Sequence, residues 1–553
     1  MAIWPLITYW VRTMRKHRSI KVLKNDADHK NSIKAQYQLF KNYKIGRFVE
    51  QDIDNERFYF RKLKENLTHS RFRLKSIKLI NFRGFSNLSV DLSSDYVVLA
   101  ANNGYGKTGV LDSVFNGLTW IVRNLKANNA NGNFIRPEDI RVGENVDSAS
   151  VILEVSLLQG EVENSTYSIN LSKTHDDAEE RQESFYQEFK SLAEMYREVS
   201  SLGFGFPVIA YYSVERGNAI KRSDFKKSLD ELLKEYNSRD YYTNTSSAPK
   251  FEFFLAWMLS VNSKRLLNDA HGTYRSIQLS NLKTLKDLQD LKSDNPEVIK
   301  LIQNLQEKID AINVDEPYAT TDSIERVFSA IYKFMPEIKN LSFSYNNNAN
   351  SIDLTCLKHG CRISVNQLSQ GEKTMLSLVC DISLRLISAN PGSENPFTGD
   401  GIVIIDEIDL HLHPIWQQTI LIRLRETFPN IQFVISTHSS NVLSTSYNHC
   451  IRKIAESKTG VNGNYDIYIP EFSLGAETSA LQEDIQDVSS RPLSLEITQK
   501  LYQYKQMVTD DKWDSTQAEE LFNELCEWGE GHDAIINKLR IDVTLRKRRR
   551  ERK

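Results

Sequence analysis

The residues with the clearest chemistry lie in a glycine-rich loop, residues 101–108, which reads Ala-Asn-Asn-Gly-Tyr-Gly-Lys-Thr. An apolar run at 96–100 predicts a buried strand before the loop, and residues 109–115 predict the first turns of a helix after it. Backbone N–H groups in such a loop can surround phosphate oxygens, and the helix N-terminus favours the same anion. Lys107 is expected to contact the β- and γ-phosphates of ATP, and Thr108 to ligate Mg²⁺. The residues predicted to bind the nucleotide here are Asn103, Gly104, Gly106, Lys107 and Thr108.

One position departs from the P-loop pattern GxxxxGK[ST], because Ala101 stands where that pattern has its first glycine. The departure concerns the first turn of the loop. The phosphate cradle itself depends on Gly104 and Gly106, which lack a Cβ and can approach the phosphates closely.

A pair of carboxylates, Asp406 and Glu407, ends an apolar run that begins at residue 401. The run predicts a buried parallel strand, and open α/β sheets bind their ligands at the carboxyl ends of such strands. Asp406 is expected to hold Mg²⁺, directly or through water. Glu407 is expected to orient the attacking water and to act as its general base.

These side chains must be positioned by a central sheet, and the order of the predicted elements indicates the α/β class. The strand at 74–85 alternates around Ile77 and Leu79, which predicts an edge strand with one buried face, paired with 89–92. Helical spacing of apolar residues dominates before residue 70, from about 218 to 340, and after about 490. Further strands are predicted at 96–100, 151–155, 166–171, 207–213, 341–345, 351–354, 401–407 and 431–438.

The overall composition excludes several classes of protein. The chain has 553 residues, of which 26% are charged and 40% hydrophobic, and its net charge is −2, so no global field would attract nucleic acid. Five cysteines do not make a disulfide framework in a chain of this length, and they fit a reducing cytoplasm. The sequence has no apolar run long enough for a membrane span.

Residues 368–372, Leu-Ser-Gln-Gly-Glu, open a predicted helix and have two interpretations. Ser369 and Glu372 can form a capping box, which is an ordinary helix N-terminus. Alternatively, the Ser369 hydroxyl and the free N–H groups at the helix start can bind a phosphate. The place of the motif, about thirty-five residues before Asp406, favours the second interpretation.

Taken together, the motifs resemble the ABC ATPases of the RecF, SMC and OLD group. This resemblance rests, in chain order, on Asn81-Phe82-Arg83-Gly84-Phe85, the P-loop, residues 368–372, residues 406–414 (Asp-Glu-Ile-Asp-Leu-His-Leu-His-Pro) and residues 436–439 (Ser-Thr-His-Ser). A later stretch makes the family resemblance more specific. It is similar to the segment after the ATPase core in PtuA-type ATPases of Septu anti-phage defence, including those of retrons, and comprises residues 475–478, 481–484 and 489–492. The resemblance covers roughly residues 74–495.

The resemblance implies an ABC-type P-loop ATPase head that is split by a helical insert, with helical N- and C-terminal regions. It also implies a dimer, or a higher homo-oligomer, in which Ser369 and Gly371 of one protomer contact ATP bound to the other. The expected domains are a helical region at 1–72 with either a Sel1-like repeat or a simple docked hairpin, lobe I at 73–217, the insert at 218–340, lobe II at 341–475, and a helical region with a basic tail at 476–553.

The same resemblance gives roles to single residues. His438 matches the switch histidine that contacts the γ-phosphate, and a polar core histidine is the alternative. His411 and His413 leave a metal site open, although Asp409 is the favoured functional residue of that loop. No Q-loop glutamine is found between the P-loop and residue 215. Asp139 is only a candidate for that position. The residues implied to act at the nucleotide are thus Arg83, Asp409 and His438.

Two functions fit the chain. The first is an ATPase subunit of an anti-phage defence complex that controls a partner HNH nuclease similar to PtuB, joined in a retron by a reverse transcriptase with its RNA–DNA hybrid. The second is a RecF-like DNA repair or recombination ATPase without a dedicated nuclease. A Toprim nuclease domain, as in OLD proteins, needs a Glu and a later Asp-x-Asp after buried strands, and the helical region after residue 495 lacks that arrangement, which favours the first function. The target, DNA or RNA, and the phage trigger stay open.

Basic residues concentrate at both ends of the chain. They are Arg12, Arg15, Lys16, Arg18 and Lys21 near the start, and seven cations within residues 546–553 at the end. Terminal charge runs are often solvated and disordered, which is one interpretation. The other is a clamp that binds the phosphates of a nucleic acid.

Overall fold

The computed structural model describes residues 20–551, with gaps at 144–145, 176–182, 201–204, 215–242, 244–320, 347–350, 392 and 458–464. The chain divides into two compact units, 1–475 and 476–553. Apart from Thr243, the predicted insert lies outside the described residues as far as residue 320. The same holds for four members of the basic N-terminal group, Arg12, Arg15, Lys16 and Arg18.

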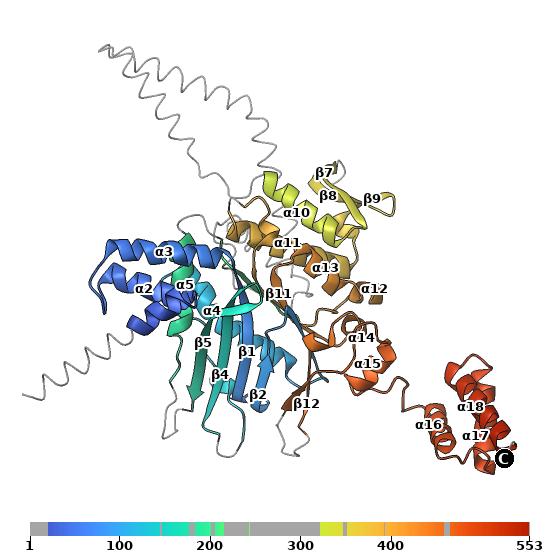
Figure 1. Cartoon of the computed structure of the whole chain (residues 1–553). Coiled ribbons are helices and arrows are strands. Elements are labelled where there is room, and N and C mark those ends of the chain that lie inside the picture. The colour runs from blue at the N-terminus through green and yellow to red at the C-terminus, as the bar shows by residue number, and fades with distance from the viewer. Residues whose placement is uncertain are drawn as a thin grey trace, which may run out of the picture. The chain divides into compact units, whose positions relative to one another are not determined.

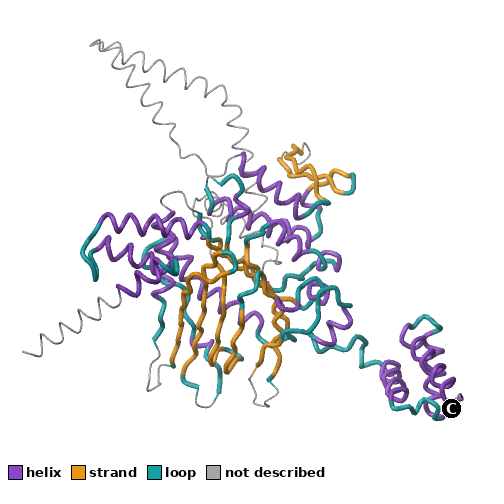
Figure 2. The backbone as a smooth tube through the Cα atoms, in the orientation of Figure 1, coloured by secondary structure: helices purple, strands orange, loops and turns teal. Residues whose placement is uncertain are grey.

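A six-stranded sheet in the order β13-β12-β3-β11-β10-β6 forms the centre of the first unit (Figures 1 and 2). Five strands are parallel, and only β13 runs antiparallel to its neighbour β12. All residues of β3, β10 and β11 are buried, as expected for parallel strands that are covered on both faces. The strands span Tyr96–Ala100 (β3), Val208–Tyr212 (β6), Gly401–Ile405 (β10), Ile431–Thr437 (β11), Ile451–Glu456 (β12) and Tyr465–Tyr468 (β13).

A second, antiparallel sheet has the order β2-β1-β4-β5. Its strands are β1 (Ser70–Phe82), β2 (Phe85–Asp91), β4 (Ser148–Gln159) and β5 (Val162–Thr174). The prediction that β1 is an edge strand is wrong, because Ile77 pairs with Val90 of β2 on one side and with Leu153 of β4 on the other. Alternation shows that one face of a strand is exposed, and it does not report how many strands lie beside it.

Two helices connect this sheet to the rest of the first unit. Helix α4 (Lys107–Lys126) packs on β4 and on strands β6 and β11 of the central sheet. At Gly117 it approaches so closely that a Cβ would lie 2.6 Å from the Leu153 side chain. Helix α5 (Gln187–Ser200) packs on α4 and β5. The predicted α/β class is thus confirmed, with the P-loop helix between the two sheets.

A helical hairpin precedes β1, and its two helices are α2 (Ile33–Ile45) and α3 (Ile53–Thr68). Ser32 caps α2, and Gly46 ends it with a left-handed φ of 74°. The hairpin packs on β5 and is tied to α5 by three ion pairs, Lys34–Glu188, Lys41–Glu194 and Lys44–Glu198. Figure 1 shows α2 and α3 beside this edge of the antiparallel sheet. The Sel1-like repeat in this region stays a prediction.

The chain after residue 320 adds further helices and a small third sheet to the first unit. Helix α11 packs against α10, which also contacts α13. The third sheet, in the order β7-β8-β9, is antiparallel. The elements are α10 (Thr321–Phe334), β7 (Ile338–Asn346), β8 (Ser351–Lys358), β9 (Cys361–Ser364), α11 (Gln370–Ala389), α12 (Pro414–Gln417), α13 (Ile420–Thr427) and α14 (Ser440–Leu443).

The second unit is helical in its described part. Its helices are α15 (Thr478–Asp484), α16 (Glu496–Thr509), α17 (Thr516–Gly529) and α18 (Ala534–Glu551). The last three share an apolar core that includes Tyr504, Trp513 and Leu525. The end of the chain is therefore helical up to residue 551, and a disordered tail is wrong for this stretch. In the residues that the structure describes, no helix has the length and apolar character needed to cross a membrane.

Candidate functional site

The glycine-rich loop joins β3 to α4 and takes its shape from two glycines. Gly104 and Gly106 have left-handed φ angles of 83° and 80°, which side chains with a Cβ rarely adopt. At Gly106 a Cβ would also lie 2.5 Å from the ring of Phe85 at the start of β2. Any larger residue at position 106 would therefore displace either the loop or the β1–β2 turn. Ala101 is buried at the end of β3, and Asn103 is exposed on the loop.

Lys107, the first residue of α4, is only 7% exposed. Its ammonium group donates to the carbonyl of Ala101 at 2.9 Å and lies 2.7 Å from Nε2 of His438, which follows β11. Because an ammonium group can only donate, Nε2 accepts, and the imidazole is neutral. Burial lowers the pKa of Lys107, and burial together with the charge of Lys107 lowers the pKa of His438. The predicted phosphate-binding cation and the predicted switch histidine thus meet directly.

Thr108, the second residue of α4, also meets Asp406, which directly follows β10. The Thr108 hydroxyl donates to Oδ2 of Asp406 at 2.8 Å, and the Ser436 hydroxyl donates to Oδ1 at 2.5 Å. Asp406 is 1% exposed. Hydroxyl and carboxylate oxygens are the ligands that Mg²⁺ prefers, so the convergence of Thr108 and Asp406 fits the predicted metal.

Glu407 follows Asp406 in a strained conformation. Its φ is 48°, which is rare for a residue with a Cβ and is found in residues held in place for function. Its N–H donates to the Ser436 hydroxyl at 2.7 Å, so one serine orders both carboxylate residues. Asp409 accepts from the Thr437 hydroxyl at 2.5 Å and from the N–H of His438 at 3.3 Å. Asp409 therefore orders the loop that carries His438.

Ser369 and Gly371 lie at the start of α11, apart from the contacts just described. Ser369 is exposed and forms the capping box with Glu372, which also pairs with Lys358 at 2.7 Å. The capping interpretation of the motif is thus realised, and it leaves Ser369 at the surface. At Gly371 a Cβ would lie 2.6 Å from the carbonyl of His411, so the start of α11 packs on the loop after Glu407.

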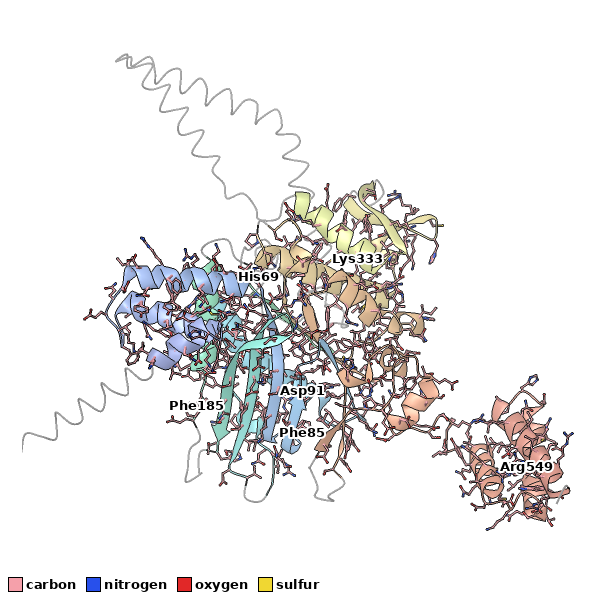
Figure 3. The ribbon with its side chains drawn as sticks, viewed as in Figure 1. His69, Phe85, Asp91, Phe185, Lys333 and Arg549 are labelled. Carbon is pink, nitrogen blue, oxygen red and sulfur yellow. The ribbon has the colours of Figure 1, made fainter. Side chains whose placement is uncertain are left out.

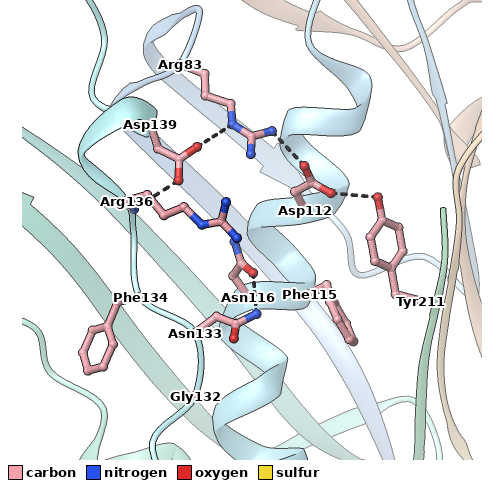
Figure 4. Close-up of a pocket in the computed structure, with 10 residues that line it drawn as sticks. All are labelled: Arg83, Asp112, Phe115, Asn116, Gly132, Asn133, Phe134, Arg136, Asp139 and Tyr211. Carbon is pink, nitrogen blue, oxygen red and sulfur yellow. Dashed lines mark hydrogen bonds and ion pairs between the residues drawn. The ribbon is translucent and has the colours of Figure 1, made fainter. Parts of the chain in front are cut away.

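Arg83 lies in the β1–β2 turn, beside the first turn of α4, where a Cβ on Gly109 would be 3.5 Å from its side chain. Its guanidinium donates to Asp139 and to Asp112, each at 2.8 Å. Burial alone would lower the pKa of Arg83, but the two carboxylates raise it above the usual value. These residues line a cavity of about 540 Å³, which Figure 4 shows together with Tyr211. Asp139, the Q-loop candidate, points toward Arg83.

Other residues of the site were given no role from the sequence. Ser436 and Thr437, which hold Asp406 and Asp409, belong to the Ser-Thr-His-Ser motif, and their hydroxyls before His438 were the available signal. Nothing in the sequence indicated that Tyr211 would donate to Asp112 at 2.8 Å. For the alternative metal site, the described residues contain no group of three or more His, Cys, Asp or Glu side chains arranged to hold a metal ion.

Comparison with known proteins places most of the chain in one family. The model of the AAA ATPase domain family matches residues 73–443. The retron Vc95 probable ATPase of Vibrio cholerae serotype O1 biovar El Tor is 32% identical over 493 residues, which cover 87% of this chain and 92% of that protein. The retron Ec83 probable ATPase of Escherichia coli is 30% identical over 534 residues, which cover 93% of this chain and 94% of that protein.

Two other matches are more limited. The Septu protein PtuA of Bacillus mycoides (strain KBAB4) is 41% identical over 75 residues, which cover 14% of this chain and 10% of that protein. Among solved structures, the Smc head domain with an extended coiled coil from Pyrococcus furiosus, bound to the C-terminal domain of ScpA, matches with a TM-score of 0.39 and 13% identity. That match covers 72% of this chain and 96% of the solved one.

Proposed function

We propose that this chain, which belongs to the AAA ATPase domain family, is the ATPase subunit of an anti-phage defence complex. The proposal rests on its similarity to the retron ATPases along nearly its whole length. In this proposal two chains pair around ATP and control a partner HNH nuclease, joined in a retron by a reverse transcriptase and its RNA–DNA hybrid. The observation that carries the ATPase role is the convergence of Lys107, Thr108 and Asp406 at the ends of β3 and β10.

The hydrolytic role follows from what each side chain can do. Lys107 binds the β- and γ-phosphates, for which it leaves His438, and the glycine-rich loop supplies backbone N–H groups. Thr108 and Asp406 would hold Mg²⁺, which when bound would neutralise phosphate charge. Glu407 accepts the proton of the attacking water, since its backbone is fixed by Ser436 while its carboxylate stays partly exposed. Once Lys107 turns to the phosphates, the neutral imidazole of His438 can donate toward the γ-phosphate only from the ring nitrogen that carries its proton.

The pairing of two chains is supported by the surface position of Ser369. Ser369 is exposed at the start of α11, where a phosphate carried by another molecule can approach the helix N-terminus, although its hydroxyl then has to leave Glu372 to bind that phosphate. The described part of residues 476–551 consists of helices α15 to α18, whereas a Toprim nuclease domain is built on strands. This supports a nuclease activity that resides in a partner protein.

The experiment that tests this function compares the purified chain, a partner HNH nuclease and the two together on plasmid DNA and on total cellular RNA. We expect neither protein alone to cut either substrate, and the complex to cut one of them in a manner that depends on the nucleotide present. Metal-dependent cutting by the chain alone that persists through a second purification would contradict the proposal. Recovery of replication proteins and no nuclease in a pull-down would favour the RecF-like alternative.

Helix α18 sharpens the hypothesis of a basic clamp, because four arginines near its end fall into two groups. Arg546 and Arg550 pair with Asp511, and Arg550 also pairs with Asp514, so these two arginines hold α18 to the α16–α17 turn. Arg548 and Arg549 are exposed, and Figure 3 labels Arg549 on this helix. For Arg548 and Arg549 the structure records no ion pair within the described part of the chain.

We therefore expect the double change Arg548→Ala and Arg549→Ala to weaken binding of the full chain to a short DNA duplex. Each lost phosphate contact lowers the slope of log affinity against log salt by about one unit, so the slope should fall by about two. Lys505→Ala, which removes an exposed cation from α16, is the matched control and should change neither quantity. Affinity and slope equal to those of the unchanged chain would show that α18 does not bind nucleic acid.

A further inference from the structure

Two consecutive tyrosines end strand β6, and each binds a different helix of the ATPase site. The Tyr211 hydroxyl donates to Asp112 of α4 at 2.8 Å, and the Tyr212 hydroxyl donates to Asp381 of α11 at 2.6 Å. Successive side chains of a strand point to opposite faces of its sheet. The pair therefore connects the P-loop helix on one face to the helix that begins at Ser369 on the other. Figure 4 shows the Tyr211 side of this connection, at the wall of the cavity.

The Tyr212 side is fully enclosed. Tyr212, Asp381 and Arg385 are each 1% exposed or less, and Arg385 donates to the same Oδ2 of Asp381 at 2.8 Å. In a buried environment little water competes for the donor and acceptor of such a hydrogen bond, so the bond holds its partners at a fixed distance. Asp381 lies twelve positions after Ser369, which is roughly 18 Å along a straight helix. A displacement at the start of α11 is thus carried to Tyr212 by a rigid helix.

The main chain of Tyr212 continues the connection to the metal ligand. Its carbonyl accepts the N–H of Asp406 at 2.8 Å, in register with the parallel pairing of β6 and β10. One residue therefore contacts α11 with its side chain and Asp406 with its backbone. The predicted insert, residues 218–340, follows β6 in the chain, and its described helix α10 packs on α11.

We propose that Tyr212 and Asp381 are positioning residues that couple the position of α11 to the position of Asp406. This inference rests on the proposed pairing of two chains, because Ser369 meets a nucleotide only across that pairing. When Ser369 engages the partner's ATP, α11 is fixed, and the Tyr212–Asp381 hydrogen bond holds Asp406 in the geometry in which it ligates Mg²⁺ with Thr108. The coupling gives hydrolysis a dependence on pairing that the P-loop by itself does not provide.

The test uses Tyr212→Phe in the full chain, which removes one hydroxyl and leaves the Asp381–Arg385 pair in place. We expect kcat for ATP to fall about 10-fold, and the Mg²⁺ concentration for half-maximal rate to rise about 10-fold, as is typical for the loss of a group that orients a metal ligand. Binding of an ATP analogue without metal should be unchanged, since Lys107 and the loop are untouched. Ser383→Ala is the matched control, because it removes a buried hydroxyl of α11 that, among the described residues, donates within its own helix to the carbonyl of Val379. It should leave kcat and the Mg²⁺ dependence unaltered.

A second readout does not depend on turnover. In the Glu407→Gln background, binding of Mn²⁺ in place of Mg²⁺ to the ATP-loaded protein can be followed by electron paramagnetic resonance, and Tyr212→Phe should weaken it about 10-fold. A Tyr212→Phe protein that melts at the temperature of the unchanged chain and keeps its kcat and Mn²⁺ affinity would overturn the coupling. So would equal losses in Ser383→Ala. If two Glu407→Gln chains do not pair in the presence of ATP, it is the proposed function that fails. The failure of the coupling and the failure of the proposed function are thereby distinguished.

Discussion

Replacement of Glu407 by Gln is expected to lower ATP hydrolysis by about 10²- to 10⁴-fold, because the amide keeps the shape of the side chain and cannot accept a proton from water. ATP binding should persist, since Lys107, Thr108 and Asp406 keep their contacts. The bound ATP should then accumulate in paired chains. Single-turnover hydrolysis and gel filtration with and without ATP measure the two effects.

The control for this variant is Lys107→Ala, which removes the cation expected on the β- and γ-phosphates and leaves Glu407 in place. It should lose ATP affinity, measured by equilibrium binding, whereas Glu407→Gln should not. A Glu407→Gln protein that hydrolyses ATP at the unchanged rate would show that another group accepts the proton. His438 would then be the next candidate, because it is neutral and lies beside Lys107.

Ser369→Arg is expected to abolish ATP-dependent pairing, because it places bulk and positive charge where the proposed pairing brings the nucleotide of the second chain. The variant also loses the N-cap of α11, which costs about 1 kcal/mol of stability and is too little to unfold a domain of this size. Light scattering with ATP, in the Glu407→Gln background, measures the loss.

Ser515→Arg is the matched control for that experiment. Ser515 caps α17 in the same way, by accepting the N–H of Ala518, and it lies in the second unit. The control should lose a similar amount of stability and keep its ATP-dependent pairing. Unchanged pairing of Ser369→Arg would remove Ser369 from the proposed interface and leave it as a helix cap alone.

Local chemistry explains what could be predicted from the sequence. The P-loop needs three things, a buried strand, left-handed glycines and the start of a helix. Residues 96–108 meet all three requirements within a short stretch. The run that ends at Asp406 is apolar throughout, and the run that ends at His438 has only Gln432 before Ser436 and Thr437, so both predicted buried strands. The capping box at Ser369 is likewise a property of four adjacent residues.

Where a prediction needed the neighbours of an element, the sequence was insufficient. The alternation in β1 correctly indicates an exposed face, yet β4 pairs with it along its second edge and makes it an inner strand. Strands β12 and β13 were not predicted, because short strands are stabilised by the strands that pair with them more than by their own pattern.

The same limit applies to the charged end of the chain and to the contacts of the site. Arg546 and Arg550 are part of an uninterrupted basic run, and only the packing of α18 on the α16–α17 turn separates them from Arg548 and Arg549. Thr108 and Asp406 are 298 positions apart, and their hydrogen bond exists because parallel strands bring their carboxyl ends to one edge of a sheet. The sequence by itself therefore determined which groups can bind phosphate, hold a metal or accept a proton. Only the tertiary structure decided which of them meet, because strand pairing and helix packing depend on partners far away in the chain.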